Sequence, residues 1–308
     1  MIRIEDLGFR ICPHARRARA FAQSPIPTPK SQLLNPKSSK GFTLVEMIMV
    51  ITITGIIGGM VAVFLKAPVQ QYMDVARRAE LTDIADTALR RVGRDLRLAL
   101  PNSVRVSPDG LYLEFLPTSG GGRYRAGAGG DELDFSAADT SFEVLGPAVA
   151  ANAGDYLVIY NLGIPSASGC TSLGADAYEG CNRRTITIGG STITFTPTTL
   201  PFPFDSPSHR FHVIATPVSY VCAPASGGVG GTLTRWQGYD IQSAQPIILP
   251  ATGTPSSALL ATNVSSCSFT YSNYVVAERS GLVTMHLGIT KDDETVTLYN
   301  AAHVSNQP

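Results

Sequence analysis

Apolar and polar positions divide the chain into three parts. From Met47 to Leu65 there are 19 residues without a charge, and Phe42 to Val45 extend this apolar segment upstream, interrupted by Glu46. As a helix, a segment of this length spans a bilayer core of about 30 Å. We therefore predict a membrane-spanning helix over residues 42–66.

A second pattern covers residues 67–100, where apolar or small residues recur every three or four positions. This spacing is typical of an amphipathic helix. Charged residues occupy the other positions, and the pairs Asp86 with Arg90 and Arg91 with Asp95 have helical spacing. We expect the charged face to be solvated and the helix to end at Pro101. The apolar positions are Val69, Met73, Ala76, Leu81, Ile84, Ala88, Val92, Leu96 and Ala99.

Beyond Pro101 the period changes to two, which indicates β-strands. Charged residues make up 16% of the chain, and 29 Gly and 21 Pro favour strands and turns. Gly-rich loops are expected at 119–130 and 225–231. We predict an α+β fold: a long N-terminal helix packed on an antiparallel β-sheet head over residues 101–308. The predicted strands are 111–116, 155–160, 184–188, 192–196, 211–215, 218–222, 232–236, 268–271, 282–287 and 295–299.

Charge is distributed unevenly although the formal net charge is zero. Residues 1–41 hold eight Lys or Arg and two Asp or Glu. A basic segment before an apolar one stays on the cytoplasmic side, so the rest is expected to be exported. No basic patch with interleaved aromatics follows this leader, and we expect no nucleic-acid partner.

Four cysteines fall in the part expected to be exported, Cys170, Cys181, Cys222 and Cys267. An even number fits an oxidising compartment, and four cysteines allow three pairings. We favour Cys170–Cys181 and Cys222–Cys267. Reduced or metal-binding thiols are the alternative, although no C-x-x-C spacing supports it.

Glu46 distinguishes the apolar segment from an ordinary membrane anchor. A carboxylate inside an apolar helix is costly and normally marks a function. A conventional signal peptide is excluded, because this apolar segment is longer than the core of a signal peptide and no small-x-small cleavage site follows it promptly.

The run Gly41-Phe42-Thr43-Leu44-Val45-Glu46 resembles the leader of type IV prepilins. The likeness covers about residues 40–66. It implies that prepilin peptidase, a membrane enzyme, cuts after Gly41 and N-methylates Phe42. It also implies a pilin-like fold and other pilins or pseudopilins as partners.

The resemblance assigns assembly roles to several residues. Glu46 would pair with the N-terminal cation of a neighbouring subunit. Thr43, together with Thr52 and Thr54, would return its hydroxyl to a backbone carbonyl one turn earlier.

Helix-weakening residues interrupt the predicted helix, among them Gly55 and Pro68, with Gly58 and Gly59 between them. Local loosening of the helix is one interpretation, and close packing against a neighbouring helix is the other. The leader over residues 1–41 is long for this family. We expect a start codon assigned too far upstream, with residues 1–30 disordered or absent from the natural product.

Three later segments look similar to minor pilins of MSHA (mannose-sensitive haemagglutinin) pilus biogenesis: Pro217–Cys222, Asn263–Tyr271 and Gly281–Met285. J-type minor pseudopilins of type II secretion are the close competitor. The resemblance implies a single-pass protein of the inner membrane with a periplasmic C-terminal head, an inner-membrane assembly platform as a partner, and a place in a pilus or pseudopilus.

Other candidate sites are weaker. His209 and His212 would point to opposite faces of a strand, and Asp292-Asp293-Glu294 has the composition of a polar hairpin turn rather than a calcium loop. No motif of catalysis or nucleotide binding is present, so we expect no enzyme activity, no metal and no cofactor. Three functions are weighed: an initiating or capping minor pilin, a tip adhesin, and an anchored enzyme. The third would need a catalytic constellation that the sequence does not show.

Overall fold

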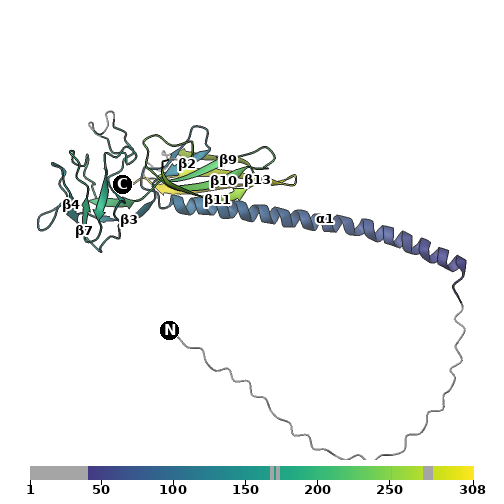
Figure 1. Cartoon of the computed structure of the whole chain (residues 1–308). Coiled ribbons are helices and arrows are strands. Elements are labelled where there is room, and N and C mark those ends of the chain that lie inside the picture. Colours follow the sequence, from purple (N-terminus) through teal and green to yellow (C-terminus); the bar gives the residue numbers. More distant parts are fainter. Residues whose placement is uncertain (1–40, 167–169, 171–173, 251, 273–279) are drawn as a thin grey trace, which may run out of the picture. The chain divides into compact units, whose positions relative to one another are not determined.

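The computed structural model describes residues 41–166, 170, 174–250, 252–272 and 280–308. The expectations for residues 1–40 of the leader lie outside the described residues. Within the described ranges, fourteen strands follow one long helix (Figure 1). The elements are α1 (Leu44–Leu96), β1 (Arg105–Val106), β2 (Tyr112–Phe115), β3 (Thr118–Arg123), β4 (Ser141–Glu143), β5 (Tyr156–Ile159), β6 (Arg183–Ile188), β7 (Thr192–Phe195), β8 (Arg210–Ile214), β9 (Val218–Ala223), β10 (Thr232–Tyr239), β11 (Gly253–Thr262), β12 (Val264–Ser272), β13 (Ser280–Lys291) and β14 (Glu294–Ser305).

The chain divides into two units, one ending at Ala62 and the other beginning at Val63. In the first unit the described residues after Thr43 are helical, and their side chains are exposed. Among the described residues, α1 is long and apolar enough to cross a membrane, with a mean hydropathy of 2.5 over its most apolar window.

The helix α1 is uninterrupted through Gly55 and Pro68. It ends at Leu96 rather than at the predicted Pro101, because the chain joins the sheet region before reaching the proline. Leu98 and Ala99 donate to the carbonyls three residues earlier, and Leu100 donates to the carbonyl of Leu116 at 2.7 Å. A tighter last turn therefore leads directly into pairing between extended segments.

Within the second unit, three antiparallel sheets form the β-structure. One has the strand order β1-β2-β9-β10-β11, a second β12-β13-β14, and a third β3-β8-β5-β6-β7-β4. The first two share a core with the C-terminal part of α1. The third lies beyond the end of the helix (Figure 1). The predicted class is confirmed: one long apolar N-terminal helix packs against antiparallel sheets.

The main core lies between α1 and the first two sheets. The buried helix residues are Leu81, Ala85, Ala88, Leu89, Val92 and Leu96. They contact β2, β9 and β13 through residues such as Phe115, Tyr220 and Met285. The predicted stripe was wrong at its upstream end, since Val69 and Met73 are more than half exposed. Both side chains lie upstream of Arg77, where the turn between β13 and β14 contacts the helix.

A second core fills the six-stranded sheet and contains no residue of α1. It is rich in aromatic side chains, and Phe142 contacts Tyr124, Phe195 and Phe211 at centroid distances of 5.1 to 6.1 Å. Leu116 and Val158 belong to a small cluster that connects this lobe to the main one. We call the six-stranded part, from β3 to β8, the distal lobe.

Four described strands lie outside the predicted strand segments: β1, β3, β4 and β11. Residues 119–130, expected as a loop, begin with β3, whose glycines lie against Phe211 of β8. A Cβ at Gly121 would meet the Phe211 carbonyl oxygen at 2.8 Å, so glycine is what allows this close pairing. The strand β11 was missed because its Ser- and Pro-containing sequence has no alternation of apolar and polar residues.

Candidate assembly site

The N-terminal end of α1 is closed by a cap. The hydroxyl oxygen of Thr43 accepts a hydrogen bond from the backbone N–H of Glu46 at 3.3 Å, and the Thr43 carbonyl accepts one from Met47 at 3.1 Å. Thr43 is therefore the N-cap, and Glu46 is the third residue of the helix. The pattern Thr-x-x-Glu is the sequence signature of a capping box. This signature was not among the features predicted from the sequence.

Electrostatics at this end favour an acidic residue. A helix N-terminus carries a partial positive charge from its unpaired N–H groups, and Glu46 is the acidic residue of the first turn. A cut after Gly41 would add an α-amino cation two residues before the helix. Glu46 would then face two sources of positive charge within one turn.

Three threonines were expected to return their hydroxyls to the backbone, and two do so. Thr52 donates to the carbonyl of Met49 at 2.9 Å, and Thr54 donates to that of Val50 at 2.6 Å. These bonds satisfy the hydroxyls within an apolar helix. For Thr43 the carbonyl one turn earlier lies outside the described residues, and the structure shows its hydroxyl accepting a hydrogen bond as the cap.

Charged residues of α1 bind the tip of the β13–β14 hairpin. Arg77 lies 3.5 Å from the Asp292 carboxylate, Arg78 donates to Glu294 at 2.5 Å, and Lys291 lies 3.2 Å from Glu80. Asp292 and Asp293 both have positive φ, as a two-residue type I′ turn requires. The expected polar turn is present, and the carboxylates of Asp292 and Glu294 face cations of the helix.

Asp95 binds three partners near the end of α1. Arg235 of β10 donates to its carboxylate at 2.8 Å, the hydroxyl of Tyr220 donates at 2.8 Å, and Arg91 lies at 3.2 Å. Burial raises the pKa of Tyr220, and the Asp95 charge adds to the rise. Asp95 was placed on a solvated face from the sequence. It is 14% exposed and holds the helix to β9 and β10.

Glu114 of β2 lies fully buried in the head. Arg105 donates to it at 2.6 Å and Tyr239 at 2.8 Å, and the Tyr239 hydroxyl is also hydrogen-bonded to Ser219. Burial raises the pKa of Glu114, while the Arg105 charge opposes that rise. The Arg105 guanidinium lies 3.6 Å above the ring of Tyr178. The network therefore joins β1, β2, β9 and β10 of the first sheet to Tyr178 of the small cluster that connects the two lobes.

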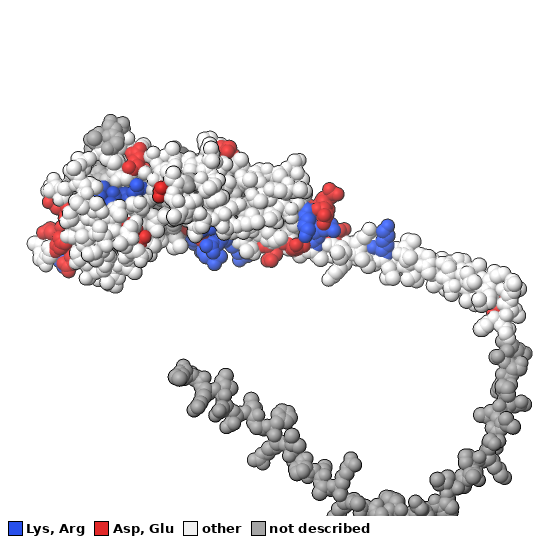
Figure 2. Space-filling view, in the orientation of Figure 1, with Lys and Arg blue, Asp and Glu red and all other residues white. Residues whose placement is uncertain are grey.

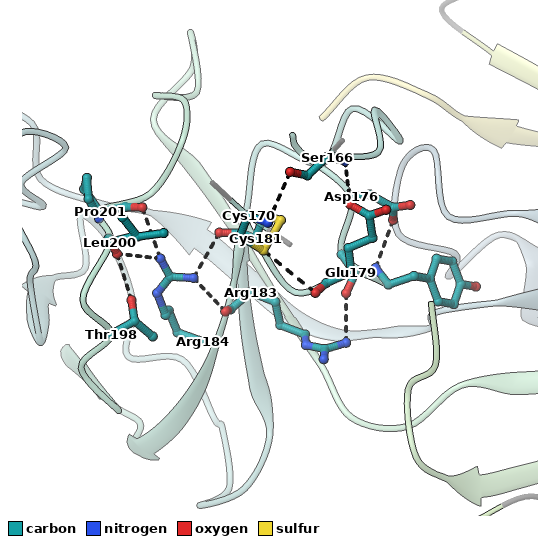
Figure 3. The surroundings of a disulfide bond; sticks show 12 residues. Ser166, Cys170, Asp176, Glu179, Cys181, Arg183, Arg184, Thr198, Leu200 and Pro201 are labelled. Carbon is teal, nitrogen blue, oxygen red and sulfur yellow. Dashed lines mark hydrogen bonds between the residues drawn. A yellow bond between two sulfur atoms is a disulfide. The ribbon is translucent and has the colours of Figure 1, made fainter. Parts of the chain in front are cut away.

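Disulfide bonds join Cys170 to Cys181 and Cys222 to Cys267, which are the favoured pairs. Cys222 lies on β9 and Cys267 on β12, so this bond connects two sheets. Cys170–Cys181 closes a loop beside Arg184 (Figure 3). The Arg184 guanidinium donates to the carbonyls of Cys181, Arg183, Leu200 and Pro201.

His209 and His212, which were weighed as a metal site and set aside, have different surroundings. His209 lies 3.5 Å from Asp205, and His212 is partly buried on β8. Burial lowers the pKa of His212, and the Arg210 charge lowers it further. Within the described ranges, no group of His, Cys, Asp and Glu side chains has the arrangement of a metal site.

Comparison with protein families places a known motif at the start of α1. Residues 36–62 match the prokaryotic N-terminal methylation motif, which is type IV prepilin-like. No curated protein and no solved structure gives a significant match to the chain. The matched segment contains the capped turn and most of the apolar helix. It supports a membrane-anchored, pilin-like structural protein.

Proposed function

We propose that this chain is a minor pilin that prepilin peptidase processes after Gly41 and N-methylates at Phe42. The mature chain is anchored in the inner membrane by residues 42–66, with residues 101–308 as a periplasmic head. It assembles with other pilins at the inner-membrane platform, and it initiates or caps a type IV pilus. The capped first turn, with Glu46 beside the future N-terminus, is the observation that carries this proposal.

Assembly follows from the charge that cleavage would create. An α-amino cation in lipid or in a filament core needs an anion, and a subunit that supplies one to its neighbour gains both attraction and register. Glu46 is the acidic residue of the apolar segment. Because it lies in the first turn of the helix, it is at nearly the same depth in the membrane as Phe42. The exposed apolar residues that continue to Val75 offer further surface for helix packing.

Size supports a minor rather than a major subunit. The head has two lobes with separate cores, whereas a repeating subunit needs only a compact head. MSHA pilus biogenesis is the system we favour, because the similar segments correspond to β9, β12 and β13 of the main core. A J-type minor pseudopilin of type II secretion is the second candidate.

A tip adhesin is a further candidate, favoured by the distal lobe. This lobe has its own aromatic core and lies beyond the end of α1, so helix packing would leave it accessible.

Deletion of the gene tests these functions. Loss of surface filaments, restored by the full-length chain, supports initiation or capping. Normal filaments that fail to adhere would contradict initiation and support the adhesin. Normal filaments and adhesion with lost protein secretion would support the pseudopilin.

A further inference from the structure

A groove runs between the C-terminal part of α1 and the outer edge of β14. Its volume is about 440 Å³. Arg90, Gly93, Arg94 and Arg97 line the helix side, and Asn300–Ala302 line the other. Three consecutive strand residues line it, so the groove is bounded by the backbone edge of β14 and not by one face of the strand.

The helix side of the groove carries uncompensated positive charge. Arg90 donates to Asp86 at 2.6 Å and is neutralised by it. Arg94 and Arg97 are exposed, and the described part of the chain offers neither one a hydrogen bond or an ion pair. Lys and Arg side chains gather over this part of α1 in the space-filling view (Figure 2).

The strand side of the groove is an unprotected sheet edge. β14 ends the order β12-β13-β14 and pairs with β13 over 12 residues without a register shift. Within the described ranges, the backbone of Thr295–Val304 makes hydrogen bonds to β13 alone. In an antiparallel edge strand, about half of the residues direct both N–H and C=O outward.

Proteins usually protect such an edge by a short strand, a bulge, a proline or an inserted charge. β14 has none of these between Thr295 and Ser305. An edge of this length therefore offers a template for another strand, and the adjacent arginines select the charge of that strand.

We propose that this groove binds an extended acidic segment of another polypeptide, which adds as a strand to the edge of β14 and pairs its carboxylates with Arg94 and Arg97. Alternate residues of a strand are about 6.6 Å apart. The two arginines are about 4.5 Å apart along the helix axis. Acidic residues at alternate positions of the added strand therefore meet both guanidinium groups. Backbone pairing supplies the affinity, and the charges supply selectivity.

Fluorescence polarisation tests the proposal with the full-length chain in detergent micelles. The probe is a labelled synthetic peptide that alternates Glu and Thr. We expect saturable binding that weakens in high salt, because exposed charges are screened. The same peptide with Lys in place of Glu should not bind. A Glu peptide that is N-methylated at alternate backbone amides should bind at least about tenfold more weakly, because it cannot complete the hydrogen-bond ladder with β14.

Variants of the groove complete the test. Replacing both Arg94→Glu and Arg97→Glu should reduce affinity about tenfold or more by like-charge repulsion. Both side chains are exposed and unpaired, so circular dichroism should show an unchanged fold. Arg210→Glu is the matched control, because it is an exposed arginine of β8 in the distal lobe, and it should leave binding unchanged. Equal binding of the methylated peptide, of the Lys peptide or of the double variant would overturn the proposal.

Discussion

Arg235 of β10 donates a hydrogen bond to Asp95 of α1 at 2.8 Å, and both side chains are 14% exposed. The pair lies 140 residues apart in the chain and joins the end of the helix to β10, an inner strand of the first sheet. The Tyr220 hydroxyl donates to the same carboxylate. The helix is therefore attached to the head by a mostly buried ion pair in addition to apolar packing.

Asp95→Asn should destabilise the head substantially. It leaves the Arg235 cation mostly buried without a counter-charge, which costs about 3 kcal/mol. The free energy of unfolding can be measured in urea from the fluorescence of Trp236, the single tryptophan. Asp86→Asn is the matched control, since the pair of Asp86 with Arg90 is exposed and contributes about 0.5 kcal/mol. Equal effects of the two substitutions would contradict a structural role for Asp95.

Glu46→Gln should reduce filament assembly while leaving cleavage intact. The substitution removes the charge but keeps a side chain of similar shape at the third helical position. Processing is followed by the mass of the membrane-associated chain, and assembly by sheared filament yield.

Thr43→Ala separates the charge from the helix cap. It removes the Thr43 hydroxyl and costs about 1 kcal/mol of helix stability, but it retains the carboxylate. Assembly should fall less than with Glu46→Gln. If Glu46→Gln assembled like the wild type, charge pairing would not be the assembly mechanism.

The two disulfides should differ in their contributions to stability. Cys222 and Cys267 are 45 positions apart, and Cys170 and Cys181 are 11 apart. A longer loop loses more unfolded-state entropy when it is closed, so replacing the first pair by alanine should cost about 4 kcal/mol and the second about 3 kcal/mol. Urea unfolding of the two double variants measures this difference. The reverse order would show that loop length does not dominate.

His212 should make the distal lobe sensitive to acid. Its pKa in the folded chain lies below the usual value near 6.5, so the unfolded state binds more protons. This contribution to stability is fully present above pH 6.5 and is lost as the pH falls through the lowered pKa. His212→Gln should lose less stability between pH 7.5 and pH 5 than the wild type does. Identical losses in both proteins would assign the acid sensitivity to other groups.

Local pattern predicted the helix and the regular strands because each depends on residues close in sequence. The period-two segment 155–160 contains β5, and the segment 282–287 lies within β13. Local pattern did not predict β3, because its glycines favour a strand only when Phe211 of β8 packs against them. The division into two cores also depends on distant pairing, such as β2 with β9, and no local signal encodes that pairing.

The site shows the same contrast. The sequence pointed to Gly41, Phe42 and Glu46 through a compact motif, and the capping box of Thr43 with Glu46 was available in the same four residues. The role of Asp95 was not available, because its partner lies in β10. The spacing of Asp95 from Arg91 correctly predicted the contact between these two residues. It did not indicate the more buried contact of Asp95 with Arg235.

Determination of the mature N-terminus tests the central claim most directly. Mass spectrometry of the membrane fraction should find a chain that begins at N-methylated Phe42, and a Gly41→Val variant should keep the mass of the unprocessed chain. A wild-type chain that retains residues before Phe42, or that begins elsewhere in the apolar segment, would contradict the proposal that it is a processed pilin.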